Sequence, residues 1–255
     1  MENNYFVGID IGSTTAKVAI FKGDQLTDTF VELTGWSSIE TAKKIQEKLI
    51  ENGITDENSK IVATGYGRVS VPYANKVVTE ISCHGIGAKY IFNENNFTVI
   101  DIGGQDTKII AMENGIVNNF FMNDKCSAGT GRFLEVMSNI LGISLDDLSD
   151  LAKNGSYTPI SSMCTVFAES EVISLIGQGT PKENIAYGVI NSVVNKVGTM
   201  CKKTDANSSY FLTGGLCDNS YIISELSKNL GSDIKSHQLG RYAGAIGAAI
   251  FAKKL

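Results

Sequence analysis

Residues 6–17 read FVGIDIGSTTAK and residues 97–108 read FTVIDIGGQDTK, so the chain contains one pattern twice. In each stretch an apolar run ends in Asp-Ile-Gly, and both aspartates and both lysines fall at one common offset. An apolar run of this length is typical of a buried strand, and the glycine-led loop after it is typical of a turn. The repeat therefore predicts a duplicated unit of strand, loop, strand and strand.

The segments around each repeat complete these units. The predicted strands are residues 5–11, 16–21 and 26–33 in the first unit, 97–102, 109–112 and 116–122 in the second, and 60–64 and 209–213 elsewhere. The predicted helices are residues 37–52, 79–92, 181–203, 219–230 and 241–254, the last rich in small residues that allow close packing. Linkers rich in Pro or Ser are absent. We expect an α/β fold with two domains, residues 1–95 with 238–255 and residues 96–237.

Composition excludes several classes of protein. The chain has 255 residues, of which 43% are apolar and 19% charged, enough for proper cores. The net charge of −5 argues against non-specific binding of nucleic acid, and no apolar run is long enough to span a membrane. Without a signal peptide pattern we expect a cytoplasmic protein with neither nucleic-acid nor membrane partners. Its five cysteines contain no CxxC pair, which speaks against a disulfide framework and a zinc ribbon.

The two Asp-Ile-Gly loops have the composition of phosphate-binding loops. The first offers backbone N–H groups and hydroxyls to phosphate oxygens from Gly12, Ser13, Thr14 and Thr15. The second offers N–H groups and a side-chain amide from Gly103, Gly104 and Gln105. A glycine pair after the last long strand, Gly214-Gly215, would let a flat ring lie against the backbone and is the predicted adenosine site.

Both loops also carry charges. Asp10 and Asp101 alone would repel a polyphosphate. They therefore predict a Mg²⁺ ion between the carboxylates and the phosphates, bound by the carboxylates through water. Lys17 and Lys108 are each either a surface charge at the end of a strand or a phosphate contact, and we include Lys17 among the expected nucleotide-binding residues. The chain has neither GxxxxGK[ST] nor a GxGxxG between an early strand and a helix, which disfavours a Walker loop and a dinucleotide enzyme.

Two cysteines precede helical patterns. Cys126 stands before the apolar series of residues 133–141, and Cys164 stands before that of residues 166–176. A helix N-terminus favours an anion such as a thiolate, so each helix is expected to begin at its cysteine. The alternative is that both are ordinary buried cysteines. Cys83, Cys201 and Cys217 are expected to be packing residues.

The twin loops and the late TGG resemble the superfamily of actin, heat-shock ATPases and sugar kinases, in which two helices cross. The resemblance implies a duplicated ribonuclease-H-like fold with ATP in the cleft between two domains. It also implies that Glu80 lies near the metal or the attacking water, although Glu80 could instead only stabilise a helix N-terminus. We expect the catalytic group to be Asp10, Glu80, Asp101 and Gln105.

Several motifs narrow the resemblance. DIGSTTAK, TGYGR, EISCHG, DIGGQDTK, MNDKCSAGTGRFLE, CTVFAESEVISL and GAIGAA together are similar to the activators of 2-hydroxyacyl-CoA dehydratases and benzoyl-CoA reductases. This family implies a homodimer that holds one [4Fe–4S] cluster between subunits, with Cys126 and Cys164 as ligands. The chain reads CHGIG where many relatives read CHARG, which leaves the role of His84 open; His84 and His237 are interpreted as structural or surface residues.

The resemblance predicts an ATP-driven one-electron donor. Reduced ferredoxin or flavodoxin would load the cluster, ATP would close or rotate the domains, and the electron would pass to a dehydratase-type partner. One alternative is a small-molecule kinase of the same superfamily, which predicts a substrate pocket with its own catalytic aspartate and no iron. A second is a scaffold or nucleotide sensor, which predicts ATP binding without an electron partner.

Overall fold

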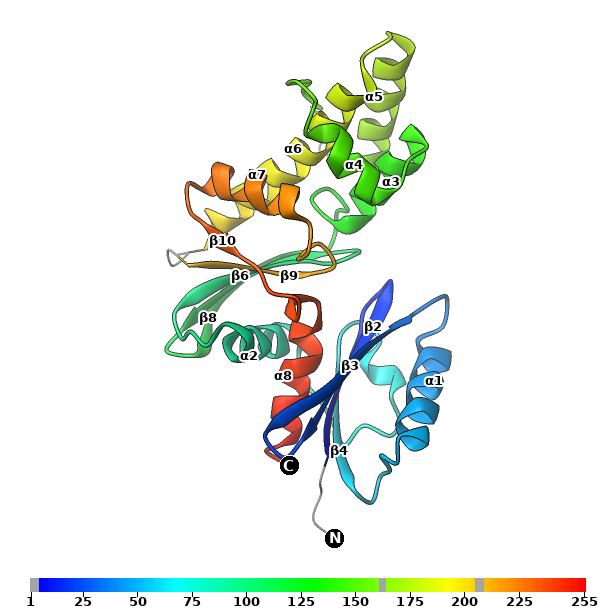
Figure 1. Cartoon of the computed structure of the whole chain (residues 1–255), viewed down its shortest axis with the longest axis vertical. Helices are drawn as coiled ribbons and strands as arrows, with labels where there is room; N and C mark the ends of the chain where they lie inside the picture. Colours follow the sequence, from blue (N-terminus) through cyan, green and yellow to red (C-terminus); the bar gives the residue numbers. More distant parts are fainter. Residues whose placement is uncertain (1–4, 161–163, 205–208) are drawn as a thin grey trace. The chain divides into compact units, whose positions relative to one another are not determined.

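The computed structural model describes residues 5–160, 164–204 and 209–255. The chain forms two compact units. Unit 1 comprises Met1–Asn96, Met112–Asn118 and His237–Leu255, and unit 2 comprises Phe97–Ala111 and Asn119–Ser236. The chain therefore begins in unit 1, builds unit 2, and returns to unit 1 for its last helix, drawn in red in Figure 1.

The first sheet has the strand order β3-β2-β1-β4-β5. Its strands are β1 (Tyr5–Ile11), β2 (Thr15–Lys22), β3 (Gln25–Leu33), β4 (Ser59–Thr64) and β5 (Lys76–Val77). β1 pairs antiparallel with β2 and parallel with β4, and this register sets Asp10 opposite both Lys17 and Thr64. The aspartate of the first repeat thus lies at the end of the central strand, beside the loop that follows it.

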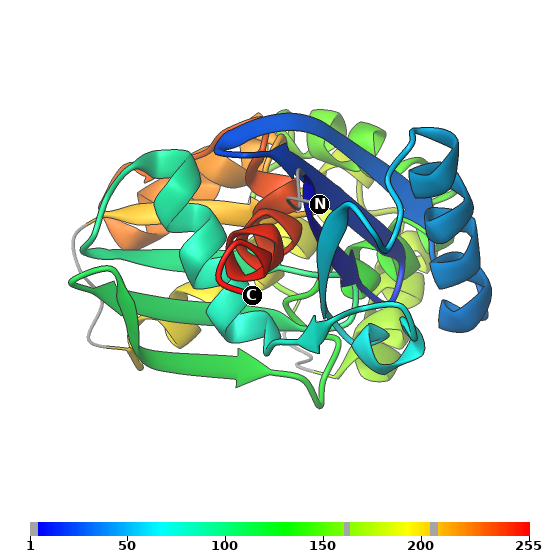
Figure 2. The ribbon, with the colours of Figure 1, turned by 90° about the horizontal axis from the view of Figure 1, so that it is seen from below.

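Helices cover both faces of the first sheet (Figure 2). On one face lies α1 (Ser38–Glu51), which begins after Ser37, whose hydroxyl accepts a hydrogen bond from the N–H of Glu40. On the other face lies α8 (Ala243–Ala252), where Gly8 of β1 allows very close approach. A Cβ on Gly8 would lie 1.9 Å from the carbonyl oxygen of Ala245. The small residues of the last helix therefore pack backbone to backbone, as its sequence predicts.

The same helix α8 crosses α2 (Glu80–Phe92) at two glycines. A Cβ on Gly87 would lie 1.8 Å from the carbonyl oxygen of Ala243, and a Cβ on Gly247 would lie 1.8 Å from that of Cys83. Only glycine fits such contacts, because the atoms opposite it are backbone atoms that cannot move aside. This crossing fixes α2, whose first turn carries Glu80, inside unit 1.

The second sheet has the order β10-β9-β6-β7-β8. Its strands are β6 (Phe97–Ile102), β7 (Thr107–Glu113), β8 (Ile116–Asn123), β9 (Tyr210–Gly214) and β10 (Ile234–Lys235). Every residue of β6 is buried, as expected for a central strand. β6 and β9 run parallel, with Asp101 opposite Thr213.

The described residues of unit 2 also form the helices α3 (Gly131–Leu141), α4 (Leu145–Ala152), α5 (Thr165–Gly177), α6 (Lys182–Cys201) and α7 (Ser220–Leu230). Their apolar residues form one core with Ile100, Ile102 and Ile109 of the sheet. α6 lies within this core and buries residues along its whole length. α5 differs, since it buries only Ala168 and Val172.

The two sheets have the same design. Reading the second sheet as β8-β7-β6-β9-β10 gives the strand order of the first, with a central strand that ends in the repeated Asp-Ile-Gly. In both, a Thr-Gly pair stands at the end of the strand parallel to it: Gly65 directly follows β4, and Gly214 is the last residue of β9. Both glycines have a positive φ, +86° for Gly65 and +85° for Gly214. A Cβ there would lie 2.5 Å from Asp10 Oδ1 in one sheet and 2.8 Å from Asp101 Oδ1 in the other. The duplication therefore extends beyond the repeated sequence.

Some predicted helix boundaries are wrong. α3 begins at Gly131 after Thr130, several residues beyond Cys126, because residues 127–130 form a turn in which Gly129 has φ +85°. Helix α4 was not predicted, although Ser144 and Asp147 form its capping box. Pro181 precedes α6 instead of lying in its first turn. No helix in the described parts of the chain combines the length and apolarity needed to cross a membrane.

Candidate functional site

The first Asp-Ile-Gly loop is a tight turn between β1 and β2. The N–H of Gly12 donates to the carbonyl oxygen of Thr15 over 3.1 Å. Thr34, which directly follows β3, holds the loop from outside: its hydroxyl donates to the carbonyl oxygen of Gly12 over 2.8 Å, and its N–H donates to that of Thr14 over 3.1 Å. Ser13 and Thr14 are exposed at the tip. The loop is thus preorganised, with a hydroxyl-rich tip open to a ligand.

The second loop repeats this turn. The N–H of Gly103 donates to the carbonyl oxygen of Asp106 over 2.9 Å, at the positions equivalent to Gly12 and Thr15. Gln105 is exposed at the tip. Here the loop also accepts hydrogen bonds from a helix, since Gly131 N–H donates to Gly103 and Arg132 N–H to Gly104, each over 2.9 Å. The second loop is therefore tied to the start of α3.

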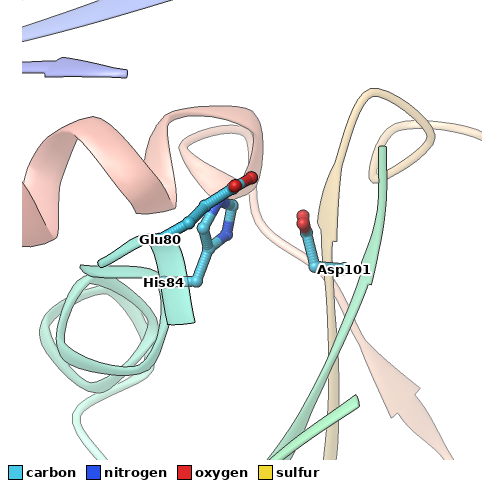
Figure 3. A group of neighbouring side chains, drawn as sticks. All are labelled: Glu80, His84 and Asp101. Carbon is cyan, nitrogen blue, oxygen red and sulfur yellow. The ribbon is translucent and has the colours of Figure 1, made fainter. Parts of the chain in front are cut away.

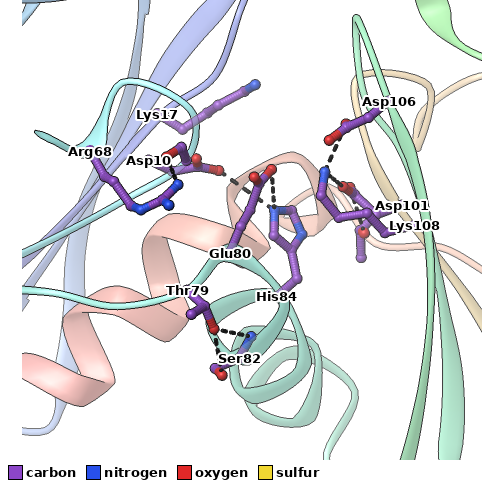
Figure 4. Close-up of polar contacts among 12 residues, drawn as sticks. Asp10, Lys17, Arg68, Thr79, Glu80, Ser82, His84, Asp101, Asp106 and Lys108 are labelled. Atoms are coloured by element: carbon purple, nitrogen blue, oxygen red, sulfur yellow. Dashed lines mark hydrogen bonds and ion pairs between the residues drawn. The ribbon is translucent and has the colours of Figure 1, made fainter. Parts of the chain in front are cut away.

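The two equivalent lysines have different environments (Figure 4). Lys108 is buried, and its ammonium lies 2.7 Å from Asp106 Oδ1 and 3.4 Å from Asp101 Oδ2. Lys17 is half-buried and lies opposite Asp10 in the register, with its Nζ 3.4 Å from the carbonyl oxygen of Thr15. Lys108 is therefore not a surface charge, because two carboxylates bind its ammonium inside unit 2. The alternative, a phosphate contact, stays a prediction.

Asp101 is held on both oxygens. Oδ1 accepts a hydrogen bond from the Thr213 hydroxyl over 3.0 Å, and Oδ2 faces the ammonium of Lys108. A carboxylate fixed in this way can orient water around a metal ion. The role of Asp101 toward Mg²⁺ stays a prediction. Thr213 was missed by sequence reasoning, although it precedes the predicted glycine pair in the motif TGG.

In unit 1 the first aspartate lies beside the start of α2. His84 is buried, and its Nε2 lies 3.6 Å from Asp10 Oδ2 and 3.9 Å from Glu80 Oε1. Glu80 and His84 are i, i+4 neighbours on one side of the helix start, as Figure 3 shows. Thr79 caps this helix by accepting the N–H of Ser82 over 3.4 Å. His84 is therefore a buried member of the acidic group, which excludes the surface alternative for this residue.

A small residue makes room for this group. A Cβ on Gly244 of α8 would lie 2.4 Å from Asp10 Oδ2 and 2.8 Å from His84 Nε2. Arg68 lies nearby in Figure 4, where its guanidinium donates to the carbonyl oxygen of Gly65 over 2.9 Å. Carboxylates and an imidazole in a partly enclosed place can hold hydrated Mg²⁺ or position a water molecule.

The predicted adenosine site lies at the end of β9. Gly214 is buried and its positive φ turns the chain directly behind Asp101. Gly215 is exposed, and a Cβ built on it would meet no atom within 4 Å. An open backbone surface beside a fixed carboxylate fits the flat ring of a nucleotide. The part assigned to these glycines stays a prediction.

The two candidate cluster cysteines lie in segments that contact each other. Cys126 is half-buried in the turn before α3, and Cys164 is exposed as the N-cap residue of α5. Ser127 Oγ and Thr165 Oγ1, the hydroxyls that follow the two cysteines, lie 2.6 Å apart. Only Cys164 stands directly at a helix start as expected. Two reduced surface thiols in adjoining segments of one unit fit half of the four-thiolate ligand set of an iron–sulfur cluster.

The other cysteines are packing residues, as expected. Cys83, Cys201 and Cys217 are buried. Burial raises the pKa of the Cys83 thiol to about 12, with a smaller contribution from Asp10 and Glu80, and burial likewise raises the pKa of Cys201 to about 12. Thiols of this kind stay protonated and are poor metal ligands.

Comparison with known proteins identifies the family. The pattern of the BadF/BadG/BcrA/BcrD ATPase family matches residues 7–252. The chain belongs to this ATPase family. It is 44% identical over 254 residues to the (R)-2-hydroxyglutaryl-CoA dehydratase activating ATPase of Acidaminococcus fermentans, covering 98% of this chain and 97% of the relative. The family resemblance drawn from the motifs is confirmed.

Solved structures agree at the level of the fold. The crystal structure of the Acidaminococcus fermentans (R)-2-hydroxyglutaryl-CoA dehydratase component A has a TM-score of 0.90 at 43% identity, covering 98% of each chain. The activator of the 2-hydroxyisocaproyl-CoA dehydratase from Clostridium difficile with bound ADPNP has a TM-score of 0.89 at 37% identity, covering 98% of this chain and 94% of that one. A ROK family glucokinase from Streptomyces griseus, 16% identical, shares the fold alone with a TM-score of 0.63, covering 98% and 100%. The predicted actin-like α/β ATPase fold is confirmed.

Proposed function

We propose that this chain is an ATP-dependent activator that donates single electrons to a 2-hydroxyacyl-CoA dehydratase-type partner. The observation that carries the proposal is the pair of surface cysteines, Cys126 and Cys164, in adjoining segments of an ATPase-family chain. Relatives of similar length are named as activators of such dehydratases, and a more distant one is named as part of a benzoyl-CoA reductase. A small-molecule kinase would have no use for two accessible thiols in this arrangement.

The nucleotide part of the proposal assigns ATP and Mg²⁺ to the two loops. Phosphate oxygens would bind to the exposed tip residues of each loop and to Lys17, whose ammonium is half-buried beside the first loop. Asp10 and Asp101 would hold Mg²⁺ through water, and Glu80 would orient the attacking water. The residues expected to bind nucleotide are Gly12, Ser13, Thr14, Thr15, Lys17, Gly103, Gly104, Gln105, Gly214 and Gly215.

The iron part of the proposal assigns a [4Fe–4S] cluster to two chains. Such a cluster takes four thiolates and, when bound, supplies a one-electron carrier. Cys126 and Cys164 give two thiolates per chain, and a twofold axis would give four. The exposed apolar side chains of α5 support a dimer through this helix: Val166, Phe167, Ile173 and Ile176 are 67%, 67%, 54% and 44% exposed. Apolar side chains of this size on the helix that Cys164 caps fit a second copy of the chain.

The remaining parts of the proposal concern partners. A one-electron donor must itself be reduced, and we assign ferredoxin or flavodoxin to this step. The reaction belongs in the cytoplasm, where thiols stay reduced. ATP can drive the transfer only by binding two conformations of the chain with different affinity. In unit 2, a change in the second loop on nucleotide binding would reach α3, because the start of α3 is hydrogen-bonded to that loop.

The deciding experiment is an iron and sulfide analysis of protein purified without oxygen, with its mass in solution. We expect iron near two per chain in a dimer, as one four-iron cluster shared by two chains requires. The Cys126→Ala and Cys164→Ala proteins should lose the iron, while Cys201→Ala, a matched change at a buried thiol, should keep it. An iron-free monomer that binds ATP would contradict the proposal and favour a small-molecule kinase.

A further inference from the structure

A pair of hydroxyls connects the two cysteine segments. Ser127 directly follows Cys126, and Thr165 directly follows Cys164. Their side-chain oxygens lie 2.6 Å apart, although 38 positions separate the two residues in the sequence. Each hydroxyl is thus one residue from a candidate ligand, and the pair spans the gap between the two segments. The contact therefore lies next to both thiols.

The Ser127 side of the pair belongs to a fixed loop. The Asn123 side-chain amide donates to the carbonyl oxygens of Cys126 and Ala128 over 2.8 and 2.9 Å. Thr130 donates to the carbonyl oxygen of Ser127 twice, from its N–H over 3.0 Å and from its hydroxyl over 2.6 Å. The backbone on both sides of the Ser127 hydroxyl is therefore held in place.

The Thr165 side belongs to a helix that buries few side chains. Thr165 is the first residue of α5, and Cys164 caps the helix without a side-chain hydrogen bond. The buried residues of α5, Ala168 and Val172, contribute apolar packing to the core of unit 2. Apolar packing is non-directional, so it resists separation of the helix more than small shifts along or around its axis. A hydrogen bond is directional, so the one at the helix start fixes that end of α5 relative to the loop.

The fixed loop is in turn bonded to the second Asp-Ile-Gly loop. The hydroxyl of Thr107, buried at the start of β7, donates to the carbonyl oxygen of Gly129 over 2.7 Å. The N–H groups of Gly131 and Arg132 donate to Gly103 and Gly104. These bonds form an unbroken series inside unit 2, from the loop with Gly103 to the cysteine segments.

We propose that the Ser127–Thr165 hydroxyl pair is a positioning contact that sets the separation of the Cys126 and Cys164 thiols and couples it to nucleotide at the Gly103–Gly104 loop. The inference deepens the proposed function and rests on it for the nucleotide and the cluster. A shift of the second loop moves the start of α3 and the Ser127 loop with it, because these are hydrogen-bonded together. The hydroxyl pair passes that shift to α5. Without the pair, the two thiols respond separately.

The test measures the rate at which a short thiol-specific bifunctional reagent joins Cys126 to Cys164 within one chain of the full-length, metal-free protein. Peptide mapping identifies the link, and a chain that keeps its monomer mass under denaturation shows that the link is internal. The variants are S127A, T165V and both together, with T165S as the conservative replacement. Thr199→Val in α6 is the matched control, since the Thr199 hydroxyl donates only locally, to the Asn195 carbonyl oxygen over 2.8 Å.

We expect S127A and T165V each to change the rate by about three- to tenfold, the equilibrium effect of one hydrogen bond. The cross-linking rate of the double variant should differ from that of the unchanged protein by no more than the rates of the single variants do, because both changes remove the same contact. T165S and T199V should behave as the unchanged protein. Addition of Mg²⁺ and a non-hydrolysable ATP analogue should shift the rate in the unchanged protein and not in S127A or T165V.

Two results would overturn the inference: rates and nucleotide responses in S127A and T165V that equal those of the unchanged protein, or effects of the two changes that simply add. Failure of the proposed function is separable, because it is read from iron. If protein purified without oxygen holds no iron but the cross-linking rates follow the expected pattern, the positioning contact stands and the cluster does not. If iron is bound and the rates are unaffected, only the positioning contact falls.

Discussion

At the scale of single residues, Lys17 and Lys108 stand at equivalent positions of the two loops and have different surroundings. Lys108 is buried between two carboxylates, whereas Lys17 is half-buried beside the loop tip. A buried ion pair that loses one partner leaves an uncompensated charge inside the protein. A partly exposed lysine has no such cost and is available to a phosphate. Equivalent sequence positions therefore imply different consequences of mutation.

We expect Lys108→Met to lower the free energy of unfolding by about 3–5 kcal/mol, because Asp101 and Asp106 would stay buried without their cation. Lys17→Met should change it by less than about 0.5 kcal/mol and weaken ATP binding by about tenfold, as the loss of one charge-assisted hydrogen bond does. Chemical denaturation and titration calorimetry measure the two effects. Lys44→Met, at an exposed site of α1, is the control and should change neither. A Lys108→Met protein as stable as the unchanged one would contradict the ion-pair argument.

The five cysteines should differ in reactivity. Burial raises the pKa of Cys83 and Cys201 to about 12, so at about pH 8 only ~10⁻⁴ of these thiols is ionised. Alkylation needs the thiolate. Cys83 and Cys201 should therefore be labelled only when the pH rises toward 12 or the chain unfolds. Cys126 and Cys164 should be labelled first in metal-free protein. Mass spectrometry after a short iodoacetamide pulse checks the order, which would be disproved by early labelling of Cys201.

The loops, their aspartates and the cysteine pair could be predicted from sequence because each is a local pattern. The surroundings of these residues could not, because partners come from other elements. His84 is an example. Its i, i+4 neighbour Glu80 can be identified from the sequence, but its contact with Asp10 depends on how β1, α2 and α8 pack together. Lys108 is a second example, because the repeated sequence does not indicate that its side chain is buried.

At the scale of elements, most strands and helices follow from their apolar patterns. β1 and β6 have the predicted ends, and Thr79 and Asn219 cap the helices that their positions favour. The start of α3 was missed because Ser, Ala, Gly and Thr in residues 127–130 suit a turn as well as a first helical turn. Residue propensity alone does not distinguish a turn from a first helical turn here. The hydrogen bonds from Gly131 and Arg132 to Gly103 and Gly104 fix the start of the helix.

The crossing of α2 and α8 gives an element-scale prediction. Gly87→Ala and Gly247→Ala should each lower the free energy of unfolding by at least about 2 kcal/mol, because the new methyl would overlap a backbone carbonyl oxygen. Gly177→Ala at the end of α5 meets nothing within 4 Å and should be neutral or slightly stabilising. Thermal and urea unfolding of the three variants measures this, and a stable Gly87→Ala protein would refute the close crossing.

At the scale of the whole molecule, the proposed dimer depends on the exposed side of α5. Phe167→Glu and Ile173→Glu should convert the protein to a monomer and abolish iron binding, because charge replaces apolar area in the proposed interface. Trp36→Ser is the control: Trp36 is 88% exposed but belongs to unit 1, and its loss should leave the mass unchanged. Light scattering under argon gives the mass, and a dimer that survives both glutamates would place the interface elsewhere.

The return of the chain to unit 1 through α8 has a consequence for the order of events during synthesis. One face of the first sheet stays uncovered until residues 243–252 have left the ribosome, although its strands are made first. Unit 2 is by then entirely translated, so it can fold ahead of the unit that precedes it in sequence. The nascent first sheet must therefore wait, with apolar residues open to chaperones, for the last helix of the chain. Protease protection of stalled nascent chains should appear in unit 2 before unit 1.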